Sequence, residues 1–98
     1  MAVYVVNKRK PESYDGKRGL KVYIGRPSIF GNPKTDGSQA EQVECYKTTF
    51  REKMQNSEPF KRAVENLKAM AQKQDVYLIC WCAPLPCHGE IIKAYLES

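Results

Sequence analysis

Apolar residues along this chain fall into two kinds of segment, short continuous runs and longer helical repeats. Runs of strand length cover Val3 to Val6 and Leu20 to Ile24, and a third begins at Val76. Each run ends in a segment rich in glycine, proline or charge, as strands that lead into loops commonly do. The first run is apolar at every position, which predicts a strand in the interior of a sheet.

Capping residues and apolar spacing predict three helices. A Ser-x-x-Glu capping box beginning at Ser38 starts a helix that extends to about Gln55. Pro59 opens a second helix, because proline costs least in a first turn. A third helix begins near His88 or Gly89. Their apolar faces are formed by Val43, Tyr46, Phe50 and Met54, by Phe60, Ala63, Val64, Leu67 and Met70, and by Ile91, Ile92, Tyr95 and Leu96.

The order of these elements predicts an α/β fold. Two helices lie between the second and third strands, and this connection allows a right-handed crossover and hence parallel pairing. We expect residues 1–98 to form a single α/β domain, in which helices pack on a small, mainly parallel sheet of three or four strands. The segments that follow the second and third strands would then leave at the same carboxyl edge, where α/β proteins usually bind ligands.

Two irregular segments at that edge carry candidate chemistry. Residues 25–33 contain two glycines and two prolines, and glycine lets a ligand approach the backbone closely. Arg26 would follow the strand end, where its planar guanidinium suits a phosphate or carboxylate; the alternative is an ion pair with a helix carboxylate. Residues 80–89 bring three of the four cysteines and the only histidine to a helix start, which favours anions. The predicted ligand-binding residues are Gly25, Arg26, Ser28, Asn32, Trp81, Cys82, Cys87, His88 and Gly89.

The cysteines at this junction have several interpretations. Strand alternation puts Cys80 and Cys82 on one face and Trp81 on the other, where it packs under a helix or borders the pocket. A thiolate is stabilised at a helix start, so Cys87 with His88 is the candidate catalytic pair if the protein is an enzyme. The structural alternative is that this pair caps the helix and fills a pocket wall. Zinc is a further alternative, but two of its ligands would be adjacent in sequence and no Cys-x-x-Cys supports them, so we expect no metal.

Positive charge is concentrated in the first third of the chain. The net charge is +5, with eight Lys and Arg against two acidic residues through Lys34, and eight against nine from Thr35 onward. This asymmetry predicts an anionic partner. A nucleotide-like small molecule is the partner we expect, and nucleic acid bound through Lys8 to Arg26 is an alternative.

Targeting signals are not evident in this sequence. No apolar run reaches membrane-spanning length, and the first residues lack the pattern of a signal peptide. We therefore expect a cytoplasmic protein with reduced cysteines and no membrane partner. A chain with so small a core is also compatible with a homo-oligomer.

Two motifs in the candidate segments resemble a known family, the small domain-of-unknown-function 4326 family of phages and bacteria. The motifs are Val22-Tyr23-Ile24-Gly25-Arg26-Pro27-Ser28 with Phe30-Gly31-Asn32-Pro33, and Cys80-Trp81-Cys82-Ala83-Pro84 with Cys87-His88-Gly89. The resemblance extends from Val3 to Leu96, with Lys34 standing where an aromatic residue commonly follows the Gly-Asn-Pro turn. It implies a cytosolic α/β domain, often encoded by phages, and supports a shared pocket at the motif residues.

Binding of an anionic, nucleotide-like small molecule is therefore the leading hypothesis. Arg26 and the helix-start N–H groups would hold phosphate, Trp81 or Tyr23 would offer a stacking face, and His88 and Asn32 would bind polar groups. In the host cytoplasm, a phage protein of this kind would sequester a host signalling nucleotide. The alternatives are a Cys/His-dependent enzyme that acts on a nucleotide or modified base, and a nucleic-acid-binding protein.

Overall fold

The structure is a computed structural model that describes residues 2–25, 28–32, 37–81 and 88–98. The three predicted strands and three predicted helices are present, with boundaries close to those expected. In chain order the elements are β1 (Val3–Asn7), the single 3₁₀ turn η1 (Pro11–Ser13), β2 (Leu20–Tyr23), α1 (Gln39–Asn56), α2 (Glu58–Ala71), β3 (Val76–Cys80) and α3 (Gly89–Glu97). No helix within the described ranges is long and apolar enough to cross a membrane.

The three strands form one parallel sheet in the order β1-β3-β2. Val76 at the start of β3 pairs with Val3 on one side and with Leu20 on the other. This arrangement confirms the predicted α/β class and the small parallel sheet. Every residue of β3 is buried, as expected of a central strand.

The prediction that Val3 to Val6 forms an interior strand is wrong, because β1 lies at an edge of the described sheet. One face of β1 packs on the core through Val3, while Tyr4 on the other face stacks on Tyr77 with ring centroids 5.0 Å apart. Both faces of β1 therefore bear apolar residues although only one of its edges is paired. A continuous apolar run reports burial of faces and does not distinguish a central strand from an edge strand.

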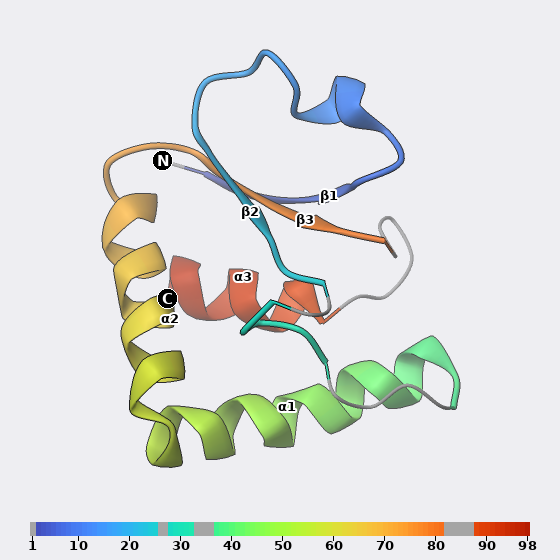
Figure 1. Cartoon of the computed structure of the whole chain (residues 1–98), viewed down its shortest axis with the longest axis vertical. Coiled ribbons are helices and arrows are strands. Elements are labelled where there is room, and N and C mark those ends of the chain that lie inside the picture. The colour runs from blue at the N-terminus through green and yellow to red at the C-terminus, as the bar shows by residue number, and fades with distance from the viewer. Residues whose placement is uncertain (1, 26–27, 33–36, 82–87) are drawn as a thin grey trace.

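All three helices lie on one face of the sheet (Figure 1). Residues 8–19, which connect β1 to β2, pass over the opposite face, which we call the helix-free face. Right-handed crossovers require this division. The connection from β1 to β2 passes across β3 in one direction, and the connection from β2 to β3 returns, so the two connections must run on opposite faces.

Serine side chains cap the first two helices; the cap at Ser38 was predicted from the sequence and the cap at Ser57 was not. The Ser38 hydroxyl accepts a hydrogen bond from the Glu41 backbone N–H at the start of α1, at 3.1 Å. The Ser57 hydroxyl accepts one from the Phe60 N–H at the start of α2, at 3.4 Å. These bonds satisfy N–H groups that have no partner within their own helix.

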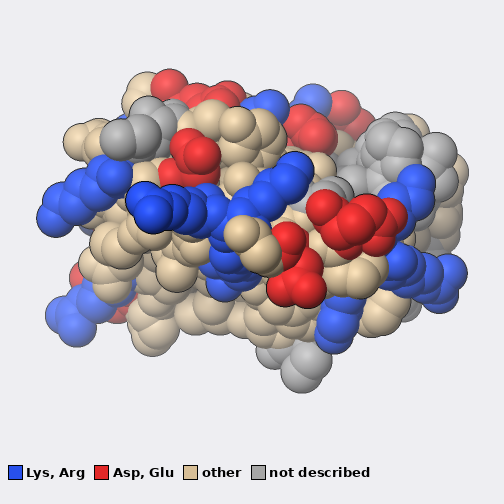
Figure 2. Space-filling model, turned by 90° about the horizontal axis from the view of Figure 1, so that it is seen from above, with Lys and Arg blue, Asp and Glu red and all other residues tan. Residues whose placement is uncertain are grey.

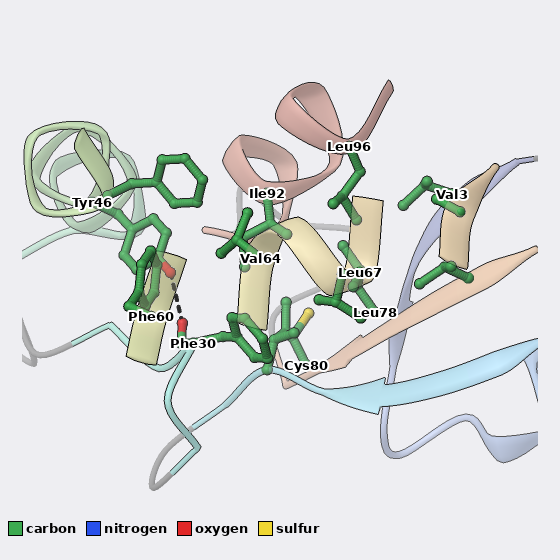
Figure 3. Close-up of a cluster of buried hydrophobic side chains, with 14 residues drawn as sticks. Val3, Phe30, Tyr46, Phe60, Val64, Leu67, Leu78, Cys80, Ile92 and Leu96 are labelled. Atoms are coloured by element: carbon green, nitrogen blue, oxygen red, sulfur yellow. Dashed lines mark hydrogen bonds between the residues drawn. The ribbon is translucent and has the colours of Figure 1, made fainter. Parts of the chain in front are cut away.

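The hydrophobic core fills the space between the sheet and the helices (Figure 3). It contains a polar contact: the fully buried Tyr46 of α1 donates its hydroxyl proton to the Phe30 carbonyl oxygen, at 2.8 Å. This hydrogen bond fastens the segment that follows β2 onto α1. The buried apolar residues of the cluster are Val3, Ile24, Phe30, Tyr46, Phe50, Phe60, Val64, Leu67, Ala71, Val76, Leu78, Cys80, Ile92 and Leu96.

Replacing Tyr46 with Phe should lower the free energy of unfolding by about 1–3 kcal/mol, because the buried Phe30 carbonyl loses its donor. Tyr4→Phe is the matched control, since Tyr4 is 43% exposed and its hydroxyl can bond to water. Urea denaturation of both variants measures the difference. Equal stability of the two variants would show that the Tyr46 hydroxyl does not anchor this segment.

Candidate functional site

The segments that follow β2 and β3 leave the sheet at the same carboxyl edge, as predicted. The Ile24 N–H donates to the Ile79 carbonyl at 2.9 Å, so the pairing of β2 with β3 continues to the edge itself. Ile24 and Trp81 are the first residues beyond the two strands, and Gly25 follows Ile24. Of the other predicted site residues, Ser28, Asn32, His88 and Gly89 are described, and Arg26, Cys82 and Cys87 lie outside the described residues.

His88 connects the start of α3 to the end of β2. Its ring Nε2 lies 2.7 Å from the Ile24 carbonyl oxygen, which can only accept, so Nε2 must carry a hydrogen and donate it. The residue is only 9% exposed, and its ring meets the edge of the Tyr46 ring at a centroid distance of 4.9 Å. The His88 carbonyl also accepts the Ile91 N–H in the first turn of α3. His88 therefore caps the helix through its backbone and fills space through its ring, as the structural alternative expects.

Gly89 allows α3 to approach the sheet closely. A Cβ atom at this position would lie 2.8 Å from Ile24 Cδ1 and 3.1 Å from Val5 Cγ1. Gly25 is constrained in a similar way, because a Cβ there would collide with the hydroxyl of Tyr23. Gly89 thus lets the helix start pack on Ile24 and Val5, whereas Gly25 leaves room for the side chain of Tyr23.

The segment 28–32 forms a compact turn beside this junction. Ser28 donates its N–H to the Gly25 carbonyl at 2.9 Å, and Gly31 donates to the Ser28 carbonyl at 3.0 Å. Asn32 is 8% exposed and donates its side-chain amide to the Gln42 carbonyl of α1, at 2.9 Å. The Ser28 hydroxyl is buried and has no hydrogen-bond partner among the described residues. A buried hydroxyl without a partner is uncommon and calls for an explanation.

Trp81 lies apart from these residues, on the helix-free face. Its indole Nε1 donates to the Tyr23 hydroxyl at 2.8 Å. Tyr23 alternates along β2 with Val22 and Ile24, which contact the core, so its ring faces away from the helices. Trp81 is 48% exposed, and it does not pack under a helix, which was one of its two predicted positions.

Two cations pack against these rings. Lys8 Nζ lies 4.8 Å from the centroid of the Tyr23 ring and 5.2 Å from that of Trp81, and Arg9 Cζ lies 5.4 Å from the Trp81 centroid. We call Lys8, Arg9, Tyr23 and Trp81 the aromatic–basic cluster. The sequence analysis included Lys8 and Arg9 only as part of a basic region. Lys8 and Arg9 directly follow the first strand, and this strand pairs with the strand that precedes Trp81. Their place in the sequence was therefore the signal that could have identified them as neighbours of Trp81.

Metal binding is not supported by the described residues. Within them, no group of three or more His, Cys, Asp or Glu is arranged to hold a metal ion. Cys80 is buried in the core and Cys45 on α1 is exposed, both as free thiols. The zinc hypothesis also needs Cys82 and Cys87, which lie outside the described residues, so the structure does not test it.

A hollow of about 380 Å³ lies between α1 and α3. Its described lining includes none of the predicted site residues, and it is formed by Lys47, Phe50, Arg51, Met54, Gln55, Ile91 and Tyr95. It was not predicted from the sequence, because its lining comes from two helices whose relative position depends on tertiary packing. It is therefore distinct from the junction at the carboxyl edge.

Comparisons with known proteins agree with the resemblance found in the sequence. The sequence model of a family described as "Domain of unknown function (DUF4326)" matches residues 6–98. An uncharacterised 12.4 kDa protein of the nrdA-td intergenic region of Enterobacteria phage T4 is 34% identical over 90 residues, which cover 90% of this chain and 71% of that protein. No solved structure matches the chain.

Replacing His88 with Phe should lower the free energy of unfolding by about 1–3 kcal/mol, because the Ile24 carbonyl loses a donor. His88→Gln should lose less, since its side-chain amide can still donate. Urea denaturation of both variants distinguishes loss of the hydrogen bond from a general change in packing. If His88→Phe is as stable as the unsubstituted protein, His88 does not hold α3 to the sheet.

Proposed function

The chain belongs to the DUF4326 family, and we propose that it binds an anionic, nucleotide-like small molecule at the carboxyl edge of its sheet. The proposed site combines the turn that begins at Gly25 with the first turn of α3. The predicted residues Arg26, Cys82 and Cys87 belong to this proposal on the strength of the sequence alone.

The observation that carries the proposal is the buried Ser28 hydroxyl without a described partner. Leaving such a group unpaired costs about 1–3 kcal/mol. The backbone N–H and carbonyl of Ser28 are both hydrogen-bonded, so the hydroxyl is the one polar group of this residue without a described partner. A ligand oxygen that bonded this hydroxyl would recover part of that cost on binding.

The nearby helix start favours a negatively charged ligand. The first turn of α3 presents the positive end of the helix dipole, and the His88–Ile24 hydrogen bond keeps this turn beside Gly25. Glu90 is an exposed carboxylate in the same first turn. The Glu90 carboxylate would compete with a ligand phosphate for the positive end of the α3 dipole. We therefore expect an anion to bind on the side of the turn that faces Gly25.

The biological setting of the proposal follows from the relative in a phage. A small cytoplasmic protein that binds a nucleotide tightly lowers its free concentration without any turnover. Sequestration of a host signalling nucleotide is therefore the role we propose for a phage-encoded member of this family.

A Cys/His-dependent enzyme is the alternative, and no described contact favours it. His88 Nε2 donates to a carbonyl, which leaves Nδ1 as the ring nitrogen that would have to accept a proton in such an enzyme. Alkylation by iodoacetamide in a Cys45→Ser background tests the alternative, because Cys45 is an exposed thiol that would mask the result. Rapid labelling of Cys87 at neutral pH that a nucleotide blocks would favour the enzyme, whereas an unreactive Cys87 leaves binding as the function.

Ser28→Ala should affect stability and binding in opposite directions. Removing an unpaired hydroxyl should leave the free energy of unfolding unchanged or raise it by up to about 1 kcal/mol. A panel of nucleoside mono-, di- and triphosphates and cyclic nucleotides should include a ligand that raises the melting temperature by about 10–20 °C at 100 times its Kd. Ser28→Ala should bind that ligand about tenfold more weakly, as loss of one hydrogen bond to a charged group would cause.

Ser38→Ala is the matched control for this substitution. It removes a hydroxyl that caps α1, so it should destabilise the free protein by about 1 kcal/mol and leave the Kd unchanged. A panel in which no nucleotide shifts the melting temperature would contradict the proposed function. A Ser28→Ala variant with unchanged Kd would remove the Ser28 hydroxyl from the site.

Glu90→Gln should strengthen binding of the same nucleotide by about two- to fivefold, since it removes a competing charge worth ~0.3–1 kcal/mol at a helix start. The gain should shrink as salt is raised, because exposed charges are screened. Glu97→Gln, at the other end of α3, is the control and should leave the Kd unchanged. Isothermal titration at two salt concentrations measures both; weaker binding by Glu90→Gln would argue against an anion at this helix start.

A further inference from the structure

The aromatic–basic cluster is held together by contacts between the ends of β1 and β3. The Lys8 N–H donates to the Cys80 carbonyl at 2.7 Å, which extends the strand pairing by one residue. Asn7 then donates its side-chain amide to the Trp81 carbonyl at 3.4 Å and accepts the Arg9 N–H at 2.8 Å. The backbones that carry the two cations and the tryptophan are therefore placed by hydrogen bonds, and their proximity does not depend on the side-chain contacts alone.

The cluster combines exposed aromatic area with unneutralised positive charge. Trp81 is the only tryptophan of the chain and is 48% exposed although two cations lie against it. Neither Lys8 nor Arg9 forms an ion pair with a described carboxylate. A half-exposed tryptophan beside two cations that pair with no described carboxylate offers an anionic, ring-bearing partner both a stacking face and positive charge.

The charge extends from the cluster along the connection between β1 and β2. Residues 8–21 contain six Lys and Arg against the two carboxylates of Glu12 and Asp15. Figure 2 shows Lys and Arg side chains crossing the face seen from above the sheet, with acidic side chains among them. On this same face, Lys21 Nζ lies 6.0 Å from the ring centroid of Tyr77.

We propose that the aromatic–basic cluster binds single-stranded nucleic acid, with an unpaired base stacked on Trp81 and phosphates held by Lys8 and Arg9. Aromatic rings stack on bases of any identity, and cations beside them bind the backbone that joins those bases. In a duplex the base faces are already stacked on each other, so a half-exposed tryptophan on a protein surface has no access to them. The occupant is therefore a single strand.

A polymer fits this surface better than a mononucleotide does. Stacking of one base on an aromatic side chain multiplies a binding constant by about 5–150. A ligand held by this stacking alone would have a Kd of about 7 mM or weaker. Useful affinity therefore needs several phosphates. Residues 8–21 supply six cations, which is enough to hold several phosphates.

This inference is independent of the proposed nucleotide site. Ser28 and His88 belong to the helix-covered side of the sheet edge, whereas Lys8 and Tyr23 belong to the helix-free face. Each proposal also has its own ligand, a mononucleotide in one case and an oligonucleotide in the other. Failure of either would leave the other intact.

Fluorescence of Trp81 tests the inference directly, because no other tryptophan contributes to the signal. Titration of the full chain with a twelve-nucleotide oligodeoxythymidine in about 50 mM salt should quench Trp81 emission in a saturable way. The logarithm of the binding constant should fall with the logarithm of the salt concentration, with a slope of about −0.7 for each phosphate held. Oligouridine in parallel shows whether the site prefers RNA or DNA.

Three variants, followed by anisotropy of a labelled oligonucleotide, separate stacking from charge. Trp81→Ala should weaken binding by about 5- to 150-fold and leave the salt slope unchanged, while Trp81→Phe should restore part of the affinity. The double variant Lys8→Gln, Arg9→Gln should make the slope of the salt dependence shallower by about 1.4, because two phosphate contacts are lost. The control, Lys61→Gln with Arg62→Gln on α2, removes the same two charges from exposed positions and should change neither affinity nor slope.

Several results would overturn the inference. One is an absence of both quenching and anisotropy change at low salt. Another is equal affinity for the single strand and its duplex. A third is equal affinity of Trp81→Ala and the unsubstituted protein for the oligonucleotide. Either result would show that charge alone, without stacking, accounts for the binding. An equal loss in the α2 control would show that net charge, and not the cluster, is responsible. An acidic peptide that quenches Trp81 while the oligonucleotides do not would identify a protein partner instead.

Discussion

The position of β3 between β1 and β2 determines where chemistry can occur in this molecule. Because all described strands run parallel, their carboxyl ends meet at one edge, and the chain must return on a helix or a long segment after each strand. The hydrogen bond from His88 to the Ile24 carbonyl then attaches the start of α3 to the same edge. The only histidine of the chain thus joins two segments that are 64 positions apart.

Local signals in the sequence were sufficient to predict the helices and the class of fold. Ser38 and Ser57 cap the helices that follow them, and proline and glycine mark the breaks, because caps and turns depend on neighbouring residues. Parallel pairing followed from the two helices between β2 and β3. The central position of β3 did not follow, since an apolar run records which faces are covered and not which edges are paired.

Tertiary contacts limited what could be predicted about the site. The sequence analysis grouped Trp81 with His88 because both follow β3, but Trp81 hydrogen-bonds Tyr23 and His88 contacts Ile24. Tyr23 and Ile24 are adjacent residues whose side chains point to opposite faces of a strand. The partner of each site residue, and hence its face, depends on register between strands that are distant in sequence. The lack of a described partner for the Ser28 hydroxyl could not have been inferred from the sequence for the same reason.

Tyr23 lies at the point where the two faces meet. Its ring belongs to the aromatic–basic cluster, while its hydroxyl lies so close to Gly25 that no side chain fits there. A molecule that displaced this ring would therefore also change the packing beside Gly25, where the turn begins. Thermodynamic linkage then requires reciprocity: if occupation of either face alters affinity at the other, the reverse effect has the same size and sign. One aromatic side chain could in this way make two separate surfaces respond to each other.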